Sequence, residues 1–204
     1  MSKKVIVVLA EGFEEVEAVT PIDYLRRAGI ELAIVAVGLK APGINPAVKG
    51  SRGIQITADT DLHSLLQEKK LVPAEWDAVV VPGGLPGSDN LAASKELAFF
   101  LKAMADAGKL ICSICAAPAR VLSPLGLLAG KNFTCFPGEE EKVIAPGSAS
   151  SAAVWKEDRV VVDGNLITSR GAGSSGEFAC AIVSKLLSEA EGKKLAERVL
   201  LLKM

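Results

Sequence analysis

The chain has 204 residues, of which 50% are hydrophobic and 23% are charged, and its net charge is −1. This length and composition are typical of one globular domain, predicted here over residues 1–204, and they exclude an intrinsically disordered chain. The charge balance argues against an electrostatic nucleic-acid or membrane-surface binder, and a single histidine, His63, beside four cysteines excludes a three-histidine zinc site.

Short apolar runs bounded by turn residues predict buried parallel strands, at residues 5–10, 32–37, 78–81, 110–114 and 166–168. The stretches between and after them predict helices, at residues 14–28, 95–107, 116–122, 177–187 and 192–202. Pro21 either kinks the first helix or begins a second one capped by Thr20. Residues 43–61 predict a hairpin or edge excursion, and residues 133–151 predict an irregular insertion. The alternation of strands and helices predicts a doubly wound, mostly parallel α/β sheet in a three-layer arrangement.

The apolar runs are too short for a membrane span or for the core of a signal peptide. The longest uncharged run covers residues 143–155 and contains proline, glycine and several serines. We therefore expect a cytoplasmic protein with no membrane partner, whose cysteines are mostly reduced.

One predicted strand end carries a candidate nucleophile. Residues 110–114 run directly into a helix at Cys115, with the small residues Ala116 and Ala117 beside it. Such a tight turn exposes a nucleophile in other α/β enzymes, and the amides of a helix N-terminus favour a thiolate. A buried cysteine without a chemical role is the alternative interpretation.

Cys112 and Cys115 also form a CxxC pair, a spacing found in redox enzymes. Cys112 lies within the predicted strand, however, so the extended backbone holds the two sulfur atoms too far apart to bridge. We expect core packing for Cys112, and also for Cys180 on its helix.

Two other loops follow strands at the same edge of the predicted sheet. Gly83 and Gly84 can direct N–H groups at an anion and, with the Ala116 amide, form an oxyanion hole, although an ordinary turn has the same composition. Glu17 lies one turn into the first helix, where a desolvated carboxyl beside a thiolate would have a raised pKa; the alternative is a solvated helix charge.

The last loop, from Gly171 to Gly176, matches GxGxxG. No second parallel strand is predicted after its helix, so we do not expect a dinucleotide site. His63 lies among polar residues and is expected on the surface, away from Cys115.

Four motifs, EGFEEVEAV, VVVPGG, ICAAP and TSRGAG, occur in an order and at spacings that closely resemble the ThiJ/PfpI superfamily, also called the DJ-one superfamily. The resemblance covers about residues 4–187 and is nearest to the DJ-one and bacterial YajL branch. It implies a flavodoxin-like α/β sandwich that forms a homodimer.

The resemblance also implies roles for individual residues. Cys115 would be the reactive, easily oxidised cysteine, and Glu17 the protonated carboxyl hydrogen-bonded to it. Gly84 and Ala116 would offer amides to a bound oxyanion or sulfinate, and Arg52 matches an arginine that reaches the site region, often across the dimer.

The chain departs from its relatives in two loops. Cys135-Phe136-Pro137 stands where some members have Thr-His-Pro, so no Cys–His pair can form there, and amidotransferase-like or protease-like activity is not expected. Cys135 becomes a candidate resolving thiol, because its loop is expected near Cys115. Gly171-Ala172-Gly173 stands where relatives have Gly-Pro-Gly, which leaves the fold intact.

Together these inferences favour a cysteine-dependent, glutathione-independent glyoxalase or protein deglycase with a protective role in oxidative stress. It would act on small α-oxoaldehydes or on glycated proteins, as a homodimer, with no metal, no other cofactor and no specific nucleic-acid partner. The alternative is a redox sensor or holdase chaperone whose cysteine is oxidised with little turnover. A purely structural module is the third possibility.

Overall fold

The computed structural model describes residues 2–38 and 46–201. A seven-stranded sheet runs through the centre of these residues in the order β10-β11-β7-β6-β1-β2-β5, and β10 pairs antiparallel with β11 while the other pairs are parallel. The strands are β1 (Lys4–Leu9), β2 (Glu31–Ala36), β5 (Thr60–Asp61), β6 (Ala78–Val81), β7 (Leu110–Ile114), β10 (Val160–Asp163) and β11 (Leu166–Ser169).

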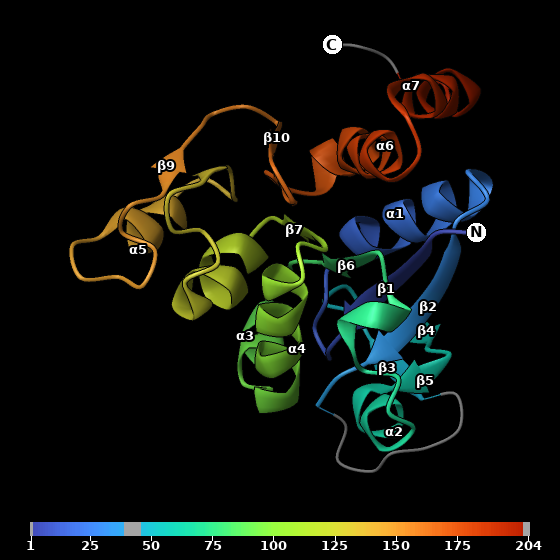
Figure 1. The fold of residues 1–204 in the computed structure, drawn as a ribbon, viewed down its shortest axis with the longest axis horizontal. Helices are drawn as coiled ribbons and strands as arrows, with labels where there is room; N and C mark the ends of the chain where they lie inside the picture. Colours follow the sequence, from blue (N-terminus) through green and yellow to red (C-terminus); the bar gives the residue numbers. More distant parts are fainter. Residues whose placement is uncertain (1, 39–45, 202–204) are drawn as a thin grey trace.

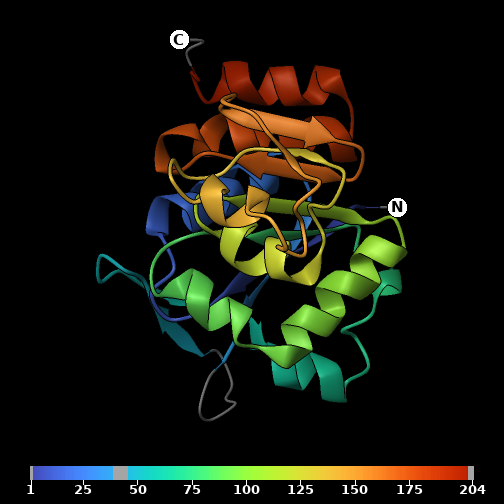
Figure 2. The ribbon, with the colours of Figure 1, turned by 90° about the vertical axis from the view of Figure 1, so that its left-hand side faces the viewer.

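Helices cover both faces of this sheet (Figure 1; Figure 2). One face is covered by α1 (Glu15–Arg27) and α6 (Ser175–Leu186), with α7 (Glu189–Arg198) packed on the outside of α6, and the other face by α2 (Leu62–Gln67), α3 (Gly87–Ala92) and α4 (Lys95–Asp106). The prediction of a mostly parallel α/β sheet between two helical layers is confirmed. No helix in the described part of the chain is long and apolar enough to cross a membrane.

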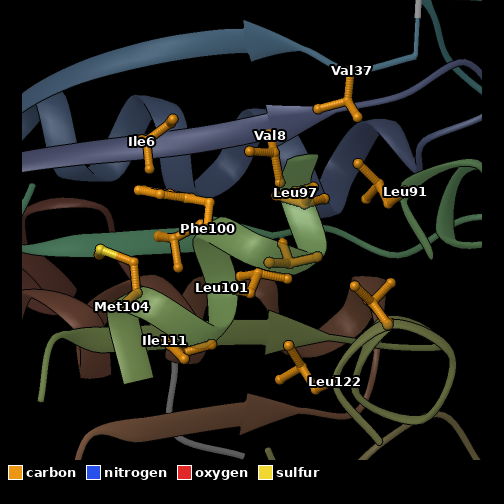
Figure 3. Close-up of a cluster of buried hydrophobic side chains, with 14 of the residues drawn as sticks. Ile6, Val8, Val37, Leu91, Leu97, Phe100, Leu101, Met104, Ile111 and Leu122 are labelled. Carbon is orange, nitrogen blue, oxygen red and sulfur yellow. The ribbon is translucent and has the colours of Figure 1, made fainter. Parts of the chain in front are cut away.

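The strands are buried on both faces, so successive side chains enter two different cores. In β1, Val5, Val7 and Leu9 pack toward α1 and α6, whereas Ile6 and Val8 pack toward α4. Figure 3 shows this second core, in which α4 lies along the sheet with its apolar face turned inward. The α4 side chains that fill it are fully buried: Leu97, Phe100, Leu101 and Met104. Burial of each such side chain stabilises the fold by roughly 1.5–3 kcal/mol.

The first helix begins and ends where its charges predict. The Glu14 side chain caps α1 by accepting a hydrogen bond from the Glu17 N–H at 2.7 Å, and Arg26 and Arg27 occupy the last turn. Pro21 lies inside α1, so the sequence forms a single helix here, and the alternative of a second helix capped by Thr20 is wrong.

The two irregular regions contain short elements. Within residues 43–61, β3 (Ala47–Lys49) and β4 (Gln55–Thr57) form the predicted antiparallel hairpin, while residues 43–45 lie outside the described residues. Residues 133–151 contain α5 (Glu140–Ile144), which lies between the paired strands β8 (Asn132–Phe133) and β9 (Val154–Trp155).

Some predicted boundaries differ from the structure. The segment predicted as a helix at 116–122 is a π-helical turn, η2 (Pro118–Leu122), followed by a 3-10 turn, η3 (Ser123–Leu125). Two more 3-10 turns are η1 (Pro73–Glu75) and η4 (Ala172–Ser174). The last predicted helix is α7, which begins at Glu189, and Leu202 lies outside the described residues.

Candidate active site

Cys115 lies at the sharp turn between β7 and η2. Its φ is +64°, a left-handed conformation that is strained for any residue other than glycine. Hydrogen bonds hold it on both sides: its N–H donates to the Ser169 carbonyl at 2.9 Å, and its own carbonyl accepts the Phe136 N–H at 2.8 Å. The neighbouring chain thus fixes a half-buried thiol at the carboxyl end of a central strand.

Two backbone amides point at the Cys115 sulfur, one from Ala116 and one from Gly84. Gly84 has a φ of +95°, and a Cβ atom there would lie 2.6 Å from the Gly12 carbonyl oxygen. Only glycine therefore fits where the loop after β6 crosses the loop after β1. This crossing brings a second amide to the thiol from a segment distant in sequence.

The Glu17 carboxyl is 1% exposed and lies beside the thiol. Its Oε2 accepts the Gly83 N–H at 3.0 Å, and the carboxyl also bonds to the Ala172 N–H and to the Cys115 thiol. Burial raises the pKa of Glu17 to about 7, with a further contribution from the Glu14 charge, and the three hydrogen bonds oppose the increase. The carboxyl therefore holds its proton over much of the range up to neutral pH.

The same surroundings also change the pKa of the Cys115 thiol. Burial raises the pKa of Cys115, the negative charge of Glu17 raises it further, and the Ala116 and Gly84 amides only partly offset this. The amides lower the pKa of the thiol as expected, but the expected net decrease below its ordinary value is wrong, because burial and the Glu17 charge outweigh the amides. Protonation of Glu17 removes the charge that opposes a thiolate and lets the carboxyl donate a hydrogen bond to sulfur, although burial still raises the pKa of the thiol.

Small residues make room for this pair. A Cβ atom on Gly83 would lie 2.5 Å from Glu17 Oε2 and 2.6 Å from the Cys115 Cβ, so any side chain there would displace one of the two. The Gly83 amide is already bonded to Glu17, whereas the Gly84 amide faces sulfur. The amide of Gly83 therefore binds the Glu17 carboxyl, and the amide of Gly84 binds the Cys115 sulfur.

The comparisons with known proteins identify the family of the chain. The sequence profile of the DJ-1/PfpI family matches residues 3–185. The chain belongs to the DJ-1/PfpI family. It is 40% identical over 197 residues to Protein DJ-1 homolog B of Arabidopsis thaliana, covering 97% of this chain but only 41% of that longer protein. It is 38% identical to Protein dj-1beta of Drosophila melanogaster, covering 98% of each chain.

Two further comparisons concern a solved structure and a relative whose name states an activity. The crystal structure of Drosophila melanogaster DJ-1beta superposes with a TM-score of 0.86 at 36% identity, covering 100% of both chains. A protein of Pyrococcus horikoshii that is named a deglycase is 30% identical over 167 residues, covering 82% of this chain and 89% of that one. The flavodoxin-like fold and the family predicted from the four motifs are therefore confirmed.

A second buried carboxylate, at the start of α1, has a role that the sequence did not reveal. Glu15 is 4% exposed, and its Oε1 accepts the Arg52 N–H at 2.6 Å and the Ile54 N–H at 3.4 Å, while Oε2 accepts the Ser51 hydroxyl. Burial raises the pKa of Glu15, but these hydrogen bonds outweigh burial and bring it below its ordinary value. Glu15 thus ties the β3–β4 turn to the first turn of α1.

Arg52 contributes its backbone to that contact, and its side chain is exposed. Among the residues described here, the Arg52 guanidinium forms no ion pair with the Cys115 site.

The loop that carries Cys135 lies beside the elbow, as predicted, because the N–H of the next residue, Phe136, donates to the Cys115 carbonyl. All four cysteines are free, and Cys112 is fully buried in the core beside α1, as its position within β7 predicts. Cys135 is also fully buried, and burial raises its pKa to about 12. His63 is exposed on α2, beyond the β5 edge of the sheet, and bonds to Gln67 at 2.8 Å. In the described segments, no three His, Cys, Asp or Glu side chains gather as metal ligands.

Proposed function

We propose that Cys115 and Glu17 convert α-oxoaldehydes to α-hydroxy acids without glutathione. The observation that carries the proposal is a buried carboxyl with a pKa near neutrality, hydrogen-bonded to an elbow thiol that also receives two backbone amides. The deglycase-named relative supports the same class of substrate.

The first step forms a carbon–sulfur bond. The Cys115 thiolate attacks the aldehyde carbon, and the aldehyde oxygen receives a proton from Glu17, which gives a hemithioacetal. The Ala116 and Gly84 amides, which already point at sulfur, are placed to stabilise the oxyanion as it develops. We assign the Gly83 amide to Glu17 instead, because that hydrogen bond is already made.

The next steps move one hydrogen within the substrate. The Glu17 carboxylate removes the hydrogen of the former aldehyde carbon as a proton, and the electron pair of that bond forms an enediolate whose charge lies on the ketone oxygen. Glu17 then returns the proton to the former ketone carbon, and the hemithioacetal hydroxyl proton passes to the former ketone oxygen as the carbonyl beside sulfur re-forms as a thioester. Water cleaves the thioester to release the hydroxy acid and the thiol. The aldehyde carbon is oxidised and the ketone carbon reduced, so no external oxidant is needed.

The same groups can act on an early adduct between an α-oxoaldehyde and a protein amine. Attack of Cys115 on the carbinol carbon breaks its bond to nitrogen, and Glu17 protonates the departing amine. The hemithioacetal that results then follows the steps above. We place this activity in the cytoplasm, as protection against carbonyl and oxidative stress.

The first test is lactate formation from methylglyoxal by the purified full chain without glutathione. The second uses a glycated peptide as the substrate and measures release of the unmodified peptide. The proposal predicts turnover that Cys115→Ala abolishes. Equal rates for the wild type and this variant would overturn it.

A redox sensor or holdase is the second candidate function. The motivation is again specific to Cys115, since its sulfur is the one that receives two amides and a carboxyl. Peroxide would oxidise the thiolate to a sulfenate with release of water, and a second peroxide would give a sulfinate, whose oxygens those donors can stabilise.

We further propose that the chain forms a homodimer through the outer face of α1. Val16 and Val19, three residues apart on α1, are 48% and 44% exposed, and Ile54 is 58% exposed. The Ile54 N–H donates to Glu15, so this side chain lies beside the first turn of α1. A second copy packed on these apolar residues would also bring its own β3–β4 turn, with Arg52, toward α1.

A further inference from the structure

We propose that Phe136 is a specificity-determining residue that selects α-oxoaldehydes with a flat apolar substituent on the ketone carbon. The inference deepens the proposed function and rests on it. Phe136 follows Cys135 in the loop after β8, and its side chain is 50% exposed. An aromatic ring left half open to solvent, on a residue whose N–H bonds to the Cys115 carbonyl, is a surface on which a substrate group can be buried.

The ring and the catalytic carboxyl border the same small space. A methyl group added to Gly171 would lie 3.6 Å from Phe136 Cδ2 and 3.8 Å from Glu17 Oε1. The absence of a side chain at Gly171 therefore leaves a gap between the carboxyl and the edge of the ring. A substrate whose aldehyde carbon is bonded to Cys115 has a place for its remaining substituent in that gap, against Phe136.

The position of Phe136 relative to the thiol is set by the backbone. Its N–H donates to the Cys115 carbonyl at 2.8 Å, so the loop is joined directly to the elbow residue. Its own carbonyl accepts the Glu139 N–H at 3.0 Å, which closes a turn over residues 136–139.

An arginine on the elbow side holds the far end of this turn. Arg120 lies in η2 and donates to both oxygens of Glu139, at 3.0 and 2.9 Å, and to Asp89 at 2.8 Å. Residues 115–120 therefore include both the elbow residue Cys115 and Arg120, whose side chain holds Glu139 at the end of the 136–139 turn. These hydrogen bonds therefore fix the backbone that carries the Phe136 ring.

The chemistry of the ring defines the substrate class. Phenylalanine offers no hydrogen-bond donor, acceptor or charge, so it discriminates by contact with apolar, preferably flat, groups. Methylglyoxal carries a methyl group, which contacts little of the ring, whereas phenylglyoxal carries a phenyl group that can stack on it. We expect a wild-type preference for phenylglyoxal in kcat/KM that depends on Phe136.

The first test compares kcat/KM for phenylglyoxal and methylglyoxal in the wild type and in Phe136→Ala. The ratio is expected to fall roughly threefold to tenfold in the variant, through loss of the aromatic contact. Phe99→Ala is the matched control, because Phe99 is a phenylalanine on α4 that is 74% exposed. An unchanged ratio in Phe136→Ala, with both substrates still turned over, overturns the inference and leaves the proposed function intact.

A second measurement keeps the inference testable if the wild type turns over neither substrate, an outcome that overturns the proposed function. Phenacyl bromide and bromoacetone alkylate Cys115 with loss of bromide, and they differ in the same phenyl and methyl groups. The ratio of their alkylation rates at Cys115, followed by intact mass, should fall by a similar factor in Phe136→Ala and stay constant in Phe99→Ala. A ratio that Phe136→Ala does not change overturns the inference by this route as well.

Discussion

The Glu17 carboxyl is hydrogen-bonded to the Cys115 thiol, and no ion pair among the described residues involves either group. A site of this kind favours one proton shared by two groups, because ionising both would place two negative charges in a buried space. The lone histidine of the chain is exposed on α2. Proton transfer in the proposed reaction therefore depends on Glu17.

The raised pKa of Glu17 makes the stability of the fold depend on pH in a defined direction. Glu17 keeps its proton in the folded chain up to about pH 7, whereas the unfolded chain loses it near the ordinary value of 4.5. Between these values the folded chain binds more protons, so stability falls as pH rises, by up to roughly 3 kcal/mol. Below the lower value and above the higher one, Glu17 has no further effect.

Glu17→Gln removes this dependence, because glutamine does not titrate. Denaturant unfolding at about pH 5 and about pH 8 should show that the variant gains stability relative to the wild type at the higher pH. Parallel pH dependences in the two proteins would show that Glu17 is already ionised at pH 5.

Gly83→Ala should disable the site through contact alone. The added methyl would lie 2.5 Å from Glu17 Oε2 and 2.6 Å from the Cys115 Cβ, so the pair must separate. We expect destabilisation of roughly 1–3 kcal/mol and a loss of activity of roughly a hundredfold.

Gly173→Ala is the matched control, since a Cβ atom there meets nothing within 4 Å. Thermal unfolding and methylglyoxal turnover should leave this variant close to the wild type. Equal effects of the two alanines would point to a general loss of loop flexibility instead of a clash at the pair.

Mild peroxide should oxidise one cysteine first. Cys112 and Cys135 are fully buried, and burial raises the pKa of both Cys180 and Cys115, but backbone amides oppose the increase only at Cys115. Cys115 alone combines partial exposure with donors that stabilise a charged sulfur. Intact mass and peptide mapping should show a gain of two oxygens at Cys115, and oxidation spread evenly over the four cysteines would contradict the redox role.

The proposed dimer should dissociate when its apolar face is charged. Light scattering during size-exclusion chromatography should give the wild type twice the 21.2 kDa mass of the chain and give Val16→Asp the mass of one chain. Val162→Asp is the control, because Val162 is 51% exposed on β10, outside the α1 face. A monomeric wild type, or a dimer that survives Val16→Asp, would exclude this face.

The sequence predicts the central strands well because their signal is local. β6 is entirely apolar, and β7 has one polar residue, Ser113, so burial on both faces gives each strand a short apolar run between turn residues. The short helix α3 was not predicted, because its six residues, GSDNLA, have little helix propensity and are held in place by the loops around Gly12 and Gly84. Tertiary contact, not local preference, forms that helix.

The same distinction applies to the site. The turn at Cys115 and the position of Glu17 one turn into a helix follow from spacing along the chain. Glu15 differs: a glutamate at the start of a helix is explained by the helix dipole alone, and its true partners lie in the turn at Ser51 to Ile54. The state of the thiol was likewise mispredicted, because burial and the Glu17 charge are properties of the assembled fold.

The central claim, that Cys115 and Glu17 act together on α-oxoaldehydes, is tested most directly by proton NMR of lactate formed from methylglyoxal in glutathione-free buffer. The wild type, Cys115→Ala and Glu17→Gln would be compared at equal concentration, with folding checked by circular dichroism. We predict steady lactate formation by the wild type, none above background for Cys115→Ala, and a rate for Glu17→Gln lower by roughly a hundredfold or more. Lactate formed at the same rate by all three folded proteins would contradict the account.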